Sequence, residues 1–360
     1  MKSALRLIPG LAMLAIAFGP WPGTAATTEP ASQIQSFVGG AGWINSPPLT
    51  PAQLQGKVVL VDFWEYTCIN CLRTLPYLRE WYRRYHGKGF VIVGVHTPEF
   101  DFSGKRANIA AAAKRLGVTW PIVIDDKATI WKRYANYVWP HEYLYDQNGR
   151  LVDSVAGEGA YPQTEARIQT LLKNSDPHAD FPPIMALLPQ DSYDKPGAVC
   201  YPETAELLIG RRPVANASAA NNPNQDTNYA YNASNPQDGA IYLQGFWHLT
   251  PEAAVSGESN GYLTLRYHAI ALTAVMKPEA GGSIRVEVTQ DGRPVAKSDA
   301  GKDLRYDADG NSYVLVDAAR AYDLIMNAHF GEYQLKLSPK SDGLGIYDVA
   351  FESCEVPSAK

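Results

Sequence analysis

Residues Val58–Pro76 read VVLVDFWEYTCINCLRTLP, and this stretch decides the fold of the first half of the chain. It opens with an unbroken apolar run followed by Asp62 and two aromatic residues, which predicts a strand buried on both faces. Beyond a short polar turn, apolar side chains recur at helical spacing, namely Leu72, Leu75, Leu78, Trp81 and Tyr82. Cys68 and Cys71 therefore stand three residues apart at a strand-to-helix junction.

The spacing and position of the two cysteines predict a redox-active pair. Cys68 falls where the N–H groups and the dipole of a helix start favour a thiolate. Cys71 lies one turn inward, close enough to form a disulfide with Cys68. Asp62 stands six residues before Cys68 at a buried position, where a carboxylate can exchange a proton with Cys71. We expect Cys68 to attack a substrate disulfide and Cys71 to resolve the mixed disulfide.

A CxxC pair is also half of many zinc sites. Tetrahedral zinc takes four ligands, usually from a second CxxC or a pair of histidines. The other cysteines, Cys200 and Cys354, are isolated in the sequence, and no H-x₃₋₅-H pair occurs. The sequence therefore favours redox chemistry over a metal site, and it predicts no cofactor beyond the Cys68–Cys71 disulfide.

The same stretch resembles the thioredoxin superfamily in Asp62, Phe63, Trp64, Cys68, Cys71 and Pro76. The longer string FWEYTCINCLRTLPYLREWY, followed by IVGVHTPEF at residues 92–100, resembles the thioredoxin-like region of DipZ-type proteins. That region belongs to the TlpA-like periplasmic branch of the superfamily. The resemblance is strong over residues 35–175 and weaker over the rest of the chain.

The resemblance also implies a substrate site around the cysteine pair. It implies a cis peptide at Trp139–Pro140, which would orient a bound substrate strand, although an ordinary trans turn proline remains the alternative. The substrate would contact six residues, namely Trp64, Tyr66, Ile69, Asn70, Val138 and Trp139. We expect Arg73 on a solvated helix face rather than at a thiol, and His96 in the core. Three acidic residues whose loops adjoin the site are expected at the surface or in turns, namely Glu65, Glu99 and Glu158.

Four segments follow from the composition of the chain, from the order of the expected strands and helices, and from the resemblance. We expect a targeting segment at 1–26, a thioredoxin-like α/β domain at 27–175, a Pro-rich linker at 176–199 and an all-β domain at 200–357. The first domain should contain a central mixed sheet flanked by helices, including a helix over 103–116.

The second domain is expected to be a β-sandwich, because at least six strands follow one another at short intervals. They lie near 242–247, 261–274, 283–290, 312–316, 331–337 and 345–352, and residues 319–327 form a short helix or an extended edge. The layout resembles the carbohydrate-binding-module-like jelly roll of DipZ-type proteins. Cys200 and Cys354 flank the domain and predict a disulfide worth about 4–5 kcal/mol in chain entropy, with two free thiols as the alternative.

The N-terminal segment and the charge of the chain bear on compartment and partners. Lys2 and Arg6 precede an apolar run that is too short to span a membrane, and small residues lead to Ala25–Ala26. We expect cleavage there and a soluble periplasmic protein, with an uncleaved anchor as the alternative. Loss of the two positive charges takes the net charge from −5 to −7, which argues against nucleic-acid binding.

The sequence thus predicts a periplasmic thiol–disulfide oxidoreductase whose partners are proteins with disulfides or dithiols. The TlpA-like resemblance favours a reductase fed by a separate membrane electron donor, whereas the Ile69–Asn70 pair leaves an oxidant or isomerase open. A different class of function is glycan or protein binding by the second domain, with the first domain as an accessory. Exposed aromatic residues would stack on a sugar, with Tyr229, Tyr231, Trp247 and Tyr262 as candidates, although burial in a sandwich core is the alternative.

Overall fold

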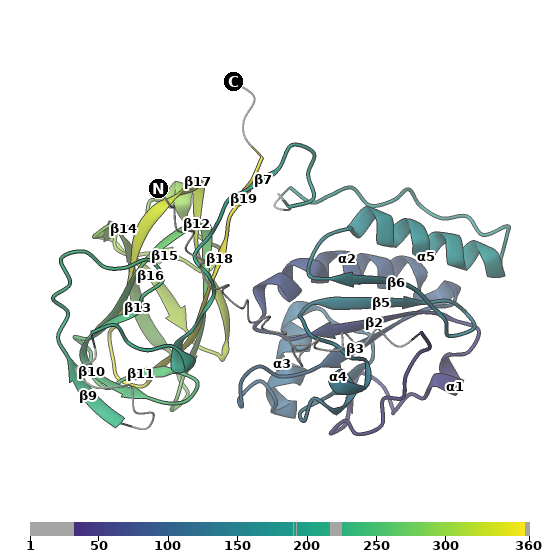
Figure 1. The fold of residues 1–360 in the computed structure, drawn as a ribbon, viewed down its shortest axis with the longest axis horizontal. Helices are drawn as coiled ribbons and strands as arrows, with labels where there is room; N and C mark the ends of the chain where they lie inside the picture. Colours follow the sequence, from purple (N-terminus) through teal and green to yellow (C-terminus); the bar gives the residue numbers. More distant parts are fainter. Residues whose placement is uncertain (1–31, 190, 192, 217–224, 357–360) are drawn as a thin grey trace, which may run out of the picture.

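The computed structural model describes residues 32–189, 191, 193–216 and 225–356. The chain forms an α/β domain and an all-β domain that lie side by side (Figure 1). The expected targeting segment at 1–26 and residue 357 lie outside the described residues. Within the described ranges, no helix is both long enough and apolar enough to span a membrane.

A six-stranded mixed sheet forms the centre of the first domain, in the order β1-β4-β3-β2-β5-β6. Its strands are β1 (Trp43–Ile44), β2 (Val58–Trp64), β3 (Phe90–His96), β4 (Ile122–Ile124), β5 (His141–Tyr145) and β6 (Leu151–Ala156). Strand β2 pairs in parallel with β3 and antiparallel with β5. All seven residues of β2 are buried, as the apolar run predicts.

Helices cover both faces of this sheet. They are α1 (Pro51–Leu54), α2 (Ile69–Tyr85), α3 (Arg106–Leu116), α4 (Thr129–Arg133) and α5 (Tyr161–Ser175), with a 3-10 turn η1 (His86–Lys88) after α2. Alternate residues of β2 point into two cores: Leu60 and Trp64 pack with residues of α2, α3 and α5, whereas Val61 and Phe63 pack with residues of α1 and α4. The thioredoxin-like α/β architecture expected from the sequence is therefore present.

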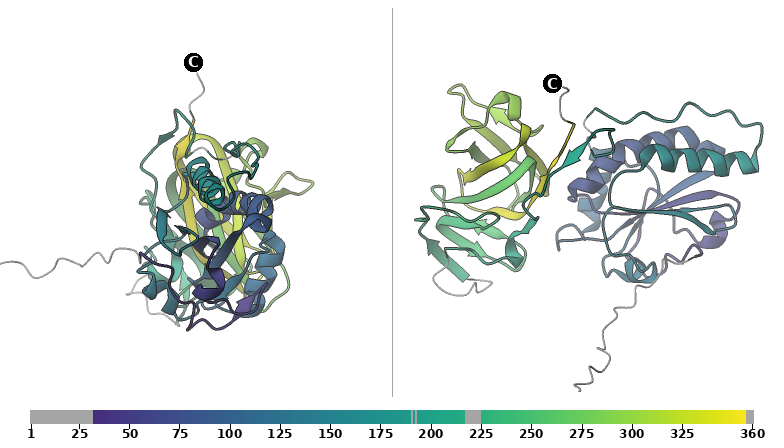
Figure 2. Two further views of the ribbon diagram at one scale, coloured as in Figure 1. Left: turned by 90° about the vertical axis from the view of Figure 1, so that its right-hand side faces the viewer. Right: turned by 45° about the horizontal axis from the view of Figure 1, so that its top comes forward.

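The second domain is built from strands that wrap around a core of their own (Figure 2). Its elements are β7 (Val199–Cys200), β8 (Leu207–Leu208), η2 (Ile209–Arg211), β9 (Gln225–Tyr229), β10 (Tyr242–Leu249), β11 (Ala254–Ser256), β12 (Tyr262–Pro278), β13 (Ile284–Gln290), β14 (Arg293–Pro294), η3 (Lys297–Asp299), β15 (Arg305–Tyr306), β16 (Ser312–Val316), β17 (Arg320–Pro339), β18 (Leu344–Glu352) and β19 (Cys354–Glu355). The all-β class is confirmed.

One element of this domain differs from the prediction. Residues 319–327 and 331–337 belong mostly to a single strand, β17, rather than to a short helix or edge followed by a separate strand. Pairing with β12 runs from Leu263–Leu337 to Met276–Arg320 and passes two irregularities in the register. A short apolar run does not distinguish helix from strand, and this long-range pairing decides the matter.

The two domains pack against each other through apolar and polar contacts. Tyr347 of β18 makes edge-on ring contacts with Phe100 and Phe102, at centroid distances of 5.4 and 4.8 Å. The backbone N–H of Asp101 donates to the carboxylate of Glu252. These contacts place the second domain beside the loop that follows β3, on the side of the first domain where the cysteine pair lies.

Candidate active site

Cys68 and Cys71 are both free thiols at the start of α2. Cys68 is the N-cap residue, and its Sγ accepts a hydrogen bond of 3.3 Å from the backbone N–H of Cys71. Cys68 is partly exposed, whereas Cys71 is fully buried. Burial raises the pKa of the Cys71 thiol well above its ordinary value, and the neighbouring Cys68 raises it further. The arrangement presents one sulfur to an incoming disulfide and keeps the other protonated.

A buried carboxyl group lies in the strand that leads to the cysteines. Asp62 is fully buried, and neither of its oxygens has a hydrogen-bond partner among the described residues. Loss of solvation raises the pKa of Asp62 to about 7. Its neighbour across the β2–β5 pair is Glu142, also buried, whose pKa is raised by burial first and by the charge of Asp62 second. A group with a pKa near 7 accepts and releases protons at neutral pH.

The segment before β5 lies against the same end of the sheet. The Trp139–Pro140 peptide is cis, and the Pro140 carbonyl accepts a hydrogen bond of 2.9 Å from Gly157 N–H. Val138 and Trp139 are partly exposed, and so are Ile69 and Asn70 in the first turn of α2. These four residues remain available for contact with a substrate.

Two of the predicted contact residues are buried, although Tyr66 lines a cavity between the domains. Trp64 is fully buried and Tyr66 is 1% exposed. The ring of His96, also fully buried, stacks on Tyr66 at 5.5 Å and meets Trp64 edge-on at 5.3 Å. Trp64 therefore supports the site from within the core, and the prediction that it contacts substrate is wrong. Burial lowers the pKa of His96 to about 3, which agrees with a neutral core histidine.

Glu65 was expected at the surface or in a turn; it lies in the turn after β2, but the structure buries it completely. Its Oε2 accepts hydrogen bonds from Thr67 N–H at 2.5 Å, from Cys68 N–H at 3.1 Å and from the Thr67 hydroxyl. Burial raises the pKa of Glu65, and these hydrogen bonds lower it in part. The side chain thus holds the turn that carries Cys68. Sequence reasoning gave it no role, because a charged residue after a strand is usually solvated.

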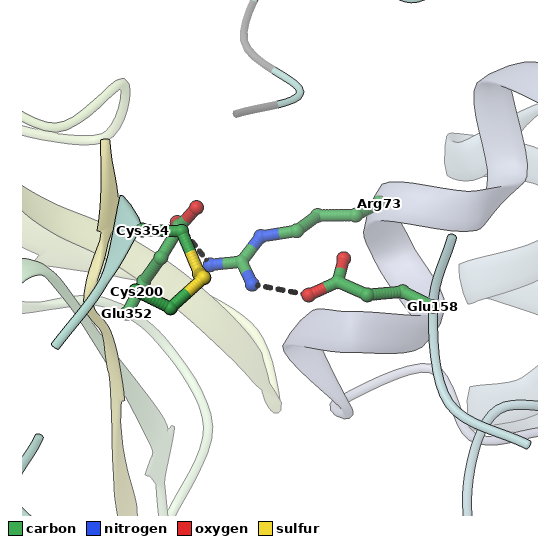
Figure 3. Close-up of a disulfide and its surroundings, with 5 residues drawn as sticks. All are labelled: Arg73, Glu158, Cys200, Glu352 and Cys354. Atoms are coloured by element: carbon green, nitrogen blue, oxygen red, sulfur yellow. Dashed lines mark hydrogen bonds and ion pairs between the residues drawn. A yellow bond between two sulfur atoms is a disulfide. The ribbon is translucent and has the colours of Figure 1, made fainter. Parts of the chain in front are cut away.

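Arg73 was expected on a solvated helix face, and it lies at the domain interface instead. Its guanidinium forms ion pairs with Glu158 at 3.1 Å and with Glu352 of β18 at 2.5 Å (Figure 3). Glu158 is itself mostly buried rather than a surface residue, and burial raises its pKa against the opposing effect of Arg73. Glu99 is half-buried, and burial raises its pKa to about 7.

A disulfide joins Cys200 and Cys354, which pair as neighbours in β7 and β19 (Figure 3). Cys354 follows Glu352 by two residues, so this bridge fastens the end of β18 close to its ion pair with Arg73. Among the described residues, no cluster of three or more His, Cys, Asp or Glu side chains could hold a metal ion.

The aromatic residues proposed for sugar stacking divide into two groups. Trp247 is fully buried and Tyr229 is 6% exposed, so both belong to the core of the second domain. Tyr231 and Tyr262 are partly exposed, with ring centroids 6.1 Å apart. Trp247 and Tyr229 are therefore removed from the candidate sugar-stacking surface.

Comparison with known proteins agrees with the two-domain architecture. Residues 45–154 match the AhpC/TSA family, and residues 204–351 match the family described as the thioredoxin like C-terminal domain. Protein DipZ of Mycobacterium tuberculosis (strain CDC 1551 / Oshkosh) is 33% identical over 273 residues, which are 75% of this chain and 38% of DipZ. The chain is therefore similar to DipZ, and its second domain matches a family of thioredoxin-like C-terminal domains.

Two further proteins are similar to shorter parts of the chain. Thiol-disulfide oxidoreductase ResA of Bacillus cereus (strain ATCC 10987 / NRS 248) is 29% identical over 123 residues, which are 34% of this chain and 66% of ResA. The solution structure of a thioredoxin-like protein in the oxidized form is 25% identical and covers 41% of this chain and 98% of that one, with a TM-score of 0.36. The chain spans well under half the length of DipZ, at 38%.

Proposed function

We propose that the protein is a periplasmic thiol–disulfide oxidoreductase that reduces disulfides in selected proteins. The observation that carries the proposal is the asymmetry of the cysteine pair. Cys68 is accessible at the start of α2, whereas Cys71 is buried one turn inward with a raised pKa. Such asymmetry separates a nucleophile from a resolving thiol.

The reaction proceeds in two exchanges. The Cys68 thiolate attacks one sulfur of the substrate disulfide, which forms a mixed disulfide and releases the other sulfur as a thiolate that takes up a proton. Asp62 then accepts the proton of Cys71, and the Cys71 thiolate attacks Cys68 Sγ. The second substrate thiol leaves, and two electrons have passed from the dithiol to the substrate. No cofactor is needed beyond the Cys68–Cys71 disulfide.

The location and the source of electrons are part of the same proposal. The Cys200–Cys354 disulfide supports an oxidising compartment, where such bonds persist. In the periplasm the oxidised enzyme must be reduced again, and we propose a separate membrane protein as the donor. A glycan partner for the second domain is the weaker proposal, and it rests on Tyr231 and Tyr262. A glycan array probed with the whole chain and with Tyr262→Ala tests it.

The decisive experiment is the equilibrium redox potential of the Cys68–Cys71 pair, with Cys68→Ala as the control. A value of about −250 mV or lower, near that of thioredoxin, supports a reductase. A value near −120 mV, as in DsbA, marks an oxidant and overturns the proposed direction. If the pair exchanges with neither glutathione nor dithiothreitol, the enzymatic proposal fails altogether.

A further inference from the structure

A cavity of about 330 Å³ lies between the two domains, and residues that follow each of the two cysteines in the chain line it. Its wall on the first domain includes Ile69 and Leu72 of α2, and Ile69 directly follows Cys68 in the chain. Its wall on the second domain includes Ala271 of β12 and Met326 of β17. The second domain therefore forms one wall of a cavity that a substrate segment bound at Cys68 could reach within a few residues.

The lining of the cavity is apolar over much of its area and partly open to solvent. Ile69 and Leu72 are partly exposed. Met326 is 40% exposed, whereas most residues of its strand β17 are buried or half-buried. A methionine side chain is flexible and polarisable, so it adapts to differently shaped apolar partners. This combination suits the side chain of a bound apolar residue.

Charged residues surround the apolar lining, and most of them are already paired. Arg320 holds Asp303 through two hydrogen bonds of 3.0 and 2.8 Å. Lys302 lies 3.8 Å from Asp323, and Arg73 joins two glutamates. The fourth acid of the lining, Asp191, accepts a hydrogen bond of 2.5 Å from the Tyr77 hydroxyl. The acids of the cavity therefore have partners on the protein.

Arg115 at the end of α3 is the exception among the cations. It lines the cavity and forms no ion pair within the described part of the chain. Arg115 is an exposed residue, and partial loss of solvation lowers the pKa of its guanidinium; the like charge of Arg320 lowers the pKa further, whereas Tyr66, Tyr322 and Asp317 raise it in part. A carboxylate from a bound partner would relieve this repulsion, which gives the rim a preference for an acidic group.

We infer that this cavity binds the segment next to the reactive cysteine of the substrate protein, with an apolar side chain in the cavity and a carboxylate at Arg115. The inference rests on the proposed function and specifies its substrate. Exchange requires the substrate sulfur to reach Cys68, and an extended chain advances about 3.3 Å per residue. Residues two or three positions from the substrate cysteine therefore fall beside Ile69 and the cavity. The second domain thus selects substrates for the first.

The test uses the whole reduced protein and three disulfides. Two are decapeptides with one cysteine, a leucine nearby and either Asp or Lys beyond it, each blocked as a mixed disulfide with 2-mercaptoethanol. The third is 2-hydroxyethyl disulfide, which is small and uncharged. Each reaction oxidises the Cys68–Cys71 dithiol and releases two thiols, so its second-order rate constant follows from the loss of protein thiols.

We expect the Asp peptide to react about two- to fivefold faster than the Lys peptide, the effect of one ion pair with an exposed arginine. Arg115→Gln should bring this ratio close to one, whereas the matched variant Lys114→Gln, one residue away and outside the lining, should preserve it. Met326→Glu should slow both peptides and leave the small disulfide unchanged, and Phe246→Glu, an exposed residue outside the cavity, should slow neither.

The outcomes separate this inference from the proposed function. If the small disulfide oxidises the dithiol but the two peptides react at equal rates, the substrate assignment is overturned and the oxidoreductase stands. If the Asp peptide still reacts faster than the Lys peptide in Arg115→Gln, the assignment of the carboxylate to Arg115 and to this cavity is overturned. If none of the three disulfides reacts, the proposed function fails, and the substrate assignment falls with it.

Discussion

Replacing Asp62 with asparagine tests whether this carboxyl group titrates in the folded protein near neutral pH. Asp62 is fully buried without a hydrogen-bond partner in the described residues, and its pKa is about 7 against an ordinary value of 3.8. The folded state therefore holds a proton that the unfolded state releases at much lower pH. Between the two pKa values the folded state binds more protons, so its stability falls as the pH rises.

The size of the effect follows from the two pKa values. A pKa difference of about three, at 1.36 kcal/mol for each, corresponds to about 4 kcal/mol. Asparagine does not titrate. The free energy of unfolding of Asp62→Asn, minus that of the wild type, should be constant below about pH 4. It should then rise by about 1.4 kcal/mol per pH unit and level off above about pH 7.

Urea unfolding of both proteins in the reduced state, from pH 3 to pH 8, measures this difference. Other buried carboxyl groups titrate in both proteins and cancel, apart from Glu142, whose pKa the charge of Asp62 raises in the wild type alone. Asp126→Asn, a substitution of an exposed aspartate, should give a flat difference curve. A flat curve for Asp62→Asn would refute the argument that burial keeps this group protonated. The same variant should lengthen the lifetime of the mixed disulfide on Cys68 by about 100-fold or more, because general-base catalysis by Asp62 is lost.

Three further predictions concern the second domain and its attachment. Arg73→Gln should lower the free energy of unfolding by about 1–3 kcal/mol, because two mostly buried carboxylates lose their partner, and urea unfolding of the whole chain measures this. Cys200→Ser with Cys354→Ser should cost about 4–5 kcal/mol, since the bridge spans 154 residues, and adding reductant to the wild type should reproduce the loss of thermal stability. Trp247→Ala should cost about 3–5 kcal/mol in urea unfolding, because this side chain fills the core; a stable variant defective only in sugar binding would contradict that assignment.

The cysteine pair and the elements that carry it are predictable because they depend on local sequence. The apolar run gives β2, the 3.6-residue spacing gives α2, and Cys68 stands at their junction. The start of the next helix shows the limit of such reasoning. It was expected at Ser103 and begins at Arg106. The Ser103 hydroxyl hydrogen-bonds to the backbone of Phe100, which keeps Ser103 in the preceding turn and outside the helix.

Burial set by tertiary packing is harder to predict from the sequence. Glu65 lies between two aromatic residues in a segment that resembles an ordinary polar turn, and nothing local shows that its Oε2 will meet three donors from Thr67 and Cys68. In the second domain, Trp247 was a candidate for an exposed platform. Its indole N–H donates to Gln244 carbonyl, which satisfies the polar atom and permits full burial.

The contact between the domains was missed for a more general reason. An amphipathic pattern divides a helix into an apolar inner face and a polar outer face, and Arg73 falls on the outer face of α2. A helix that contacts a second domain has a third kind of surface, where charged and apolar residues mix. Leu72 stands directly before Arg73, and both line the cavity between the domains. The sequence signal for a domain contact was therefore the apolar Leu72 directly beside the charged Arg73. The partner of Arg73 lies 279 residues away in the sequence, so only the folded chain identifies it as Glu352.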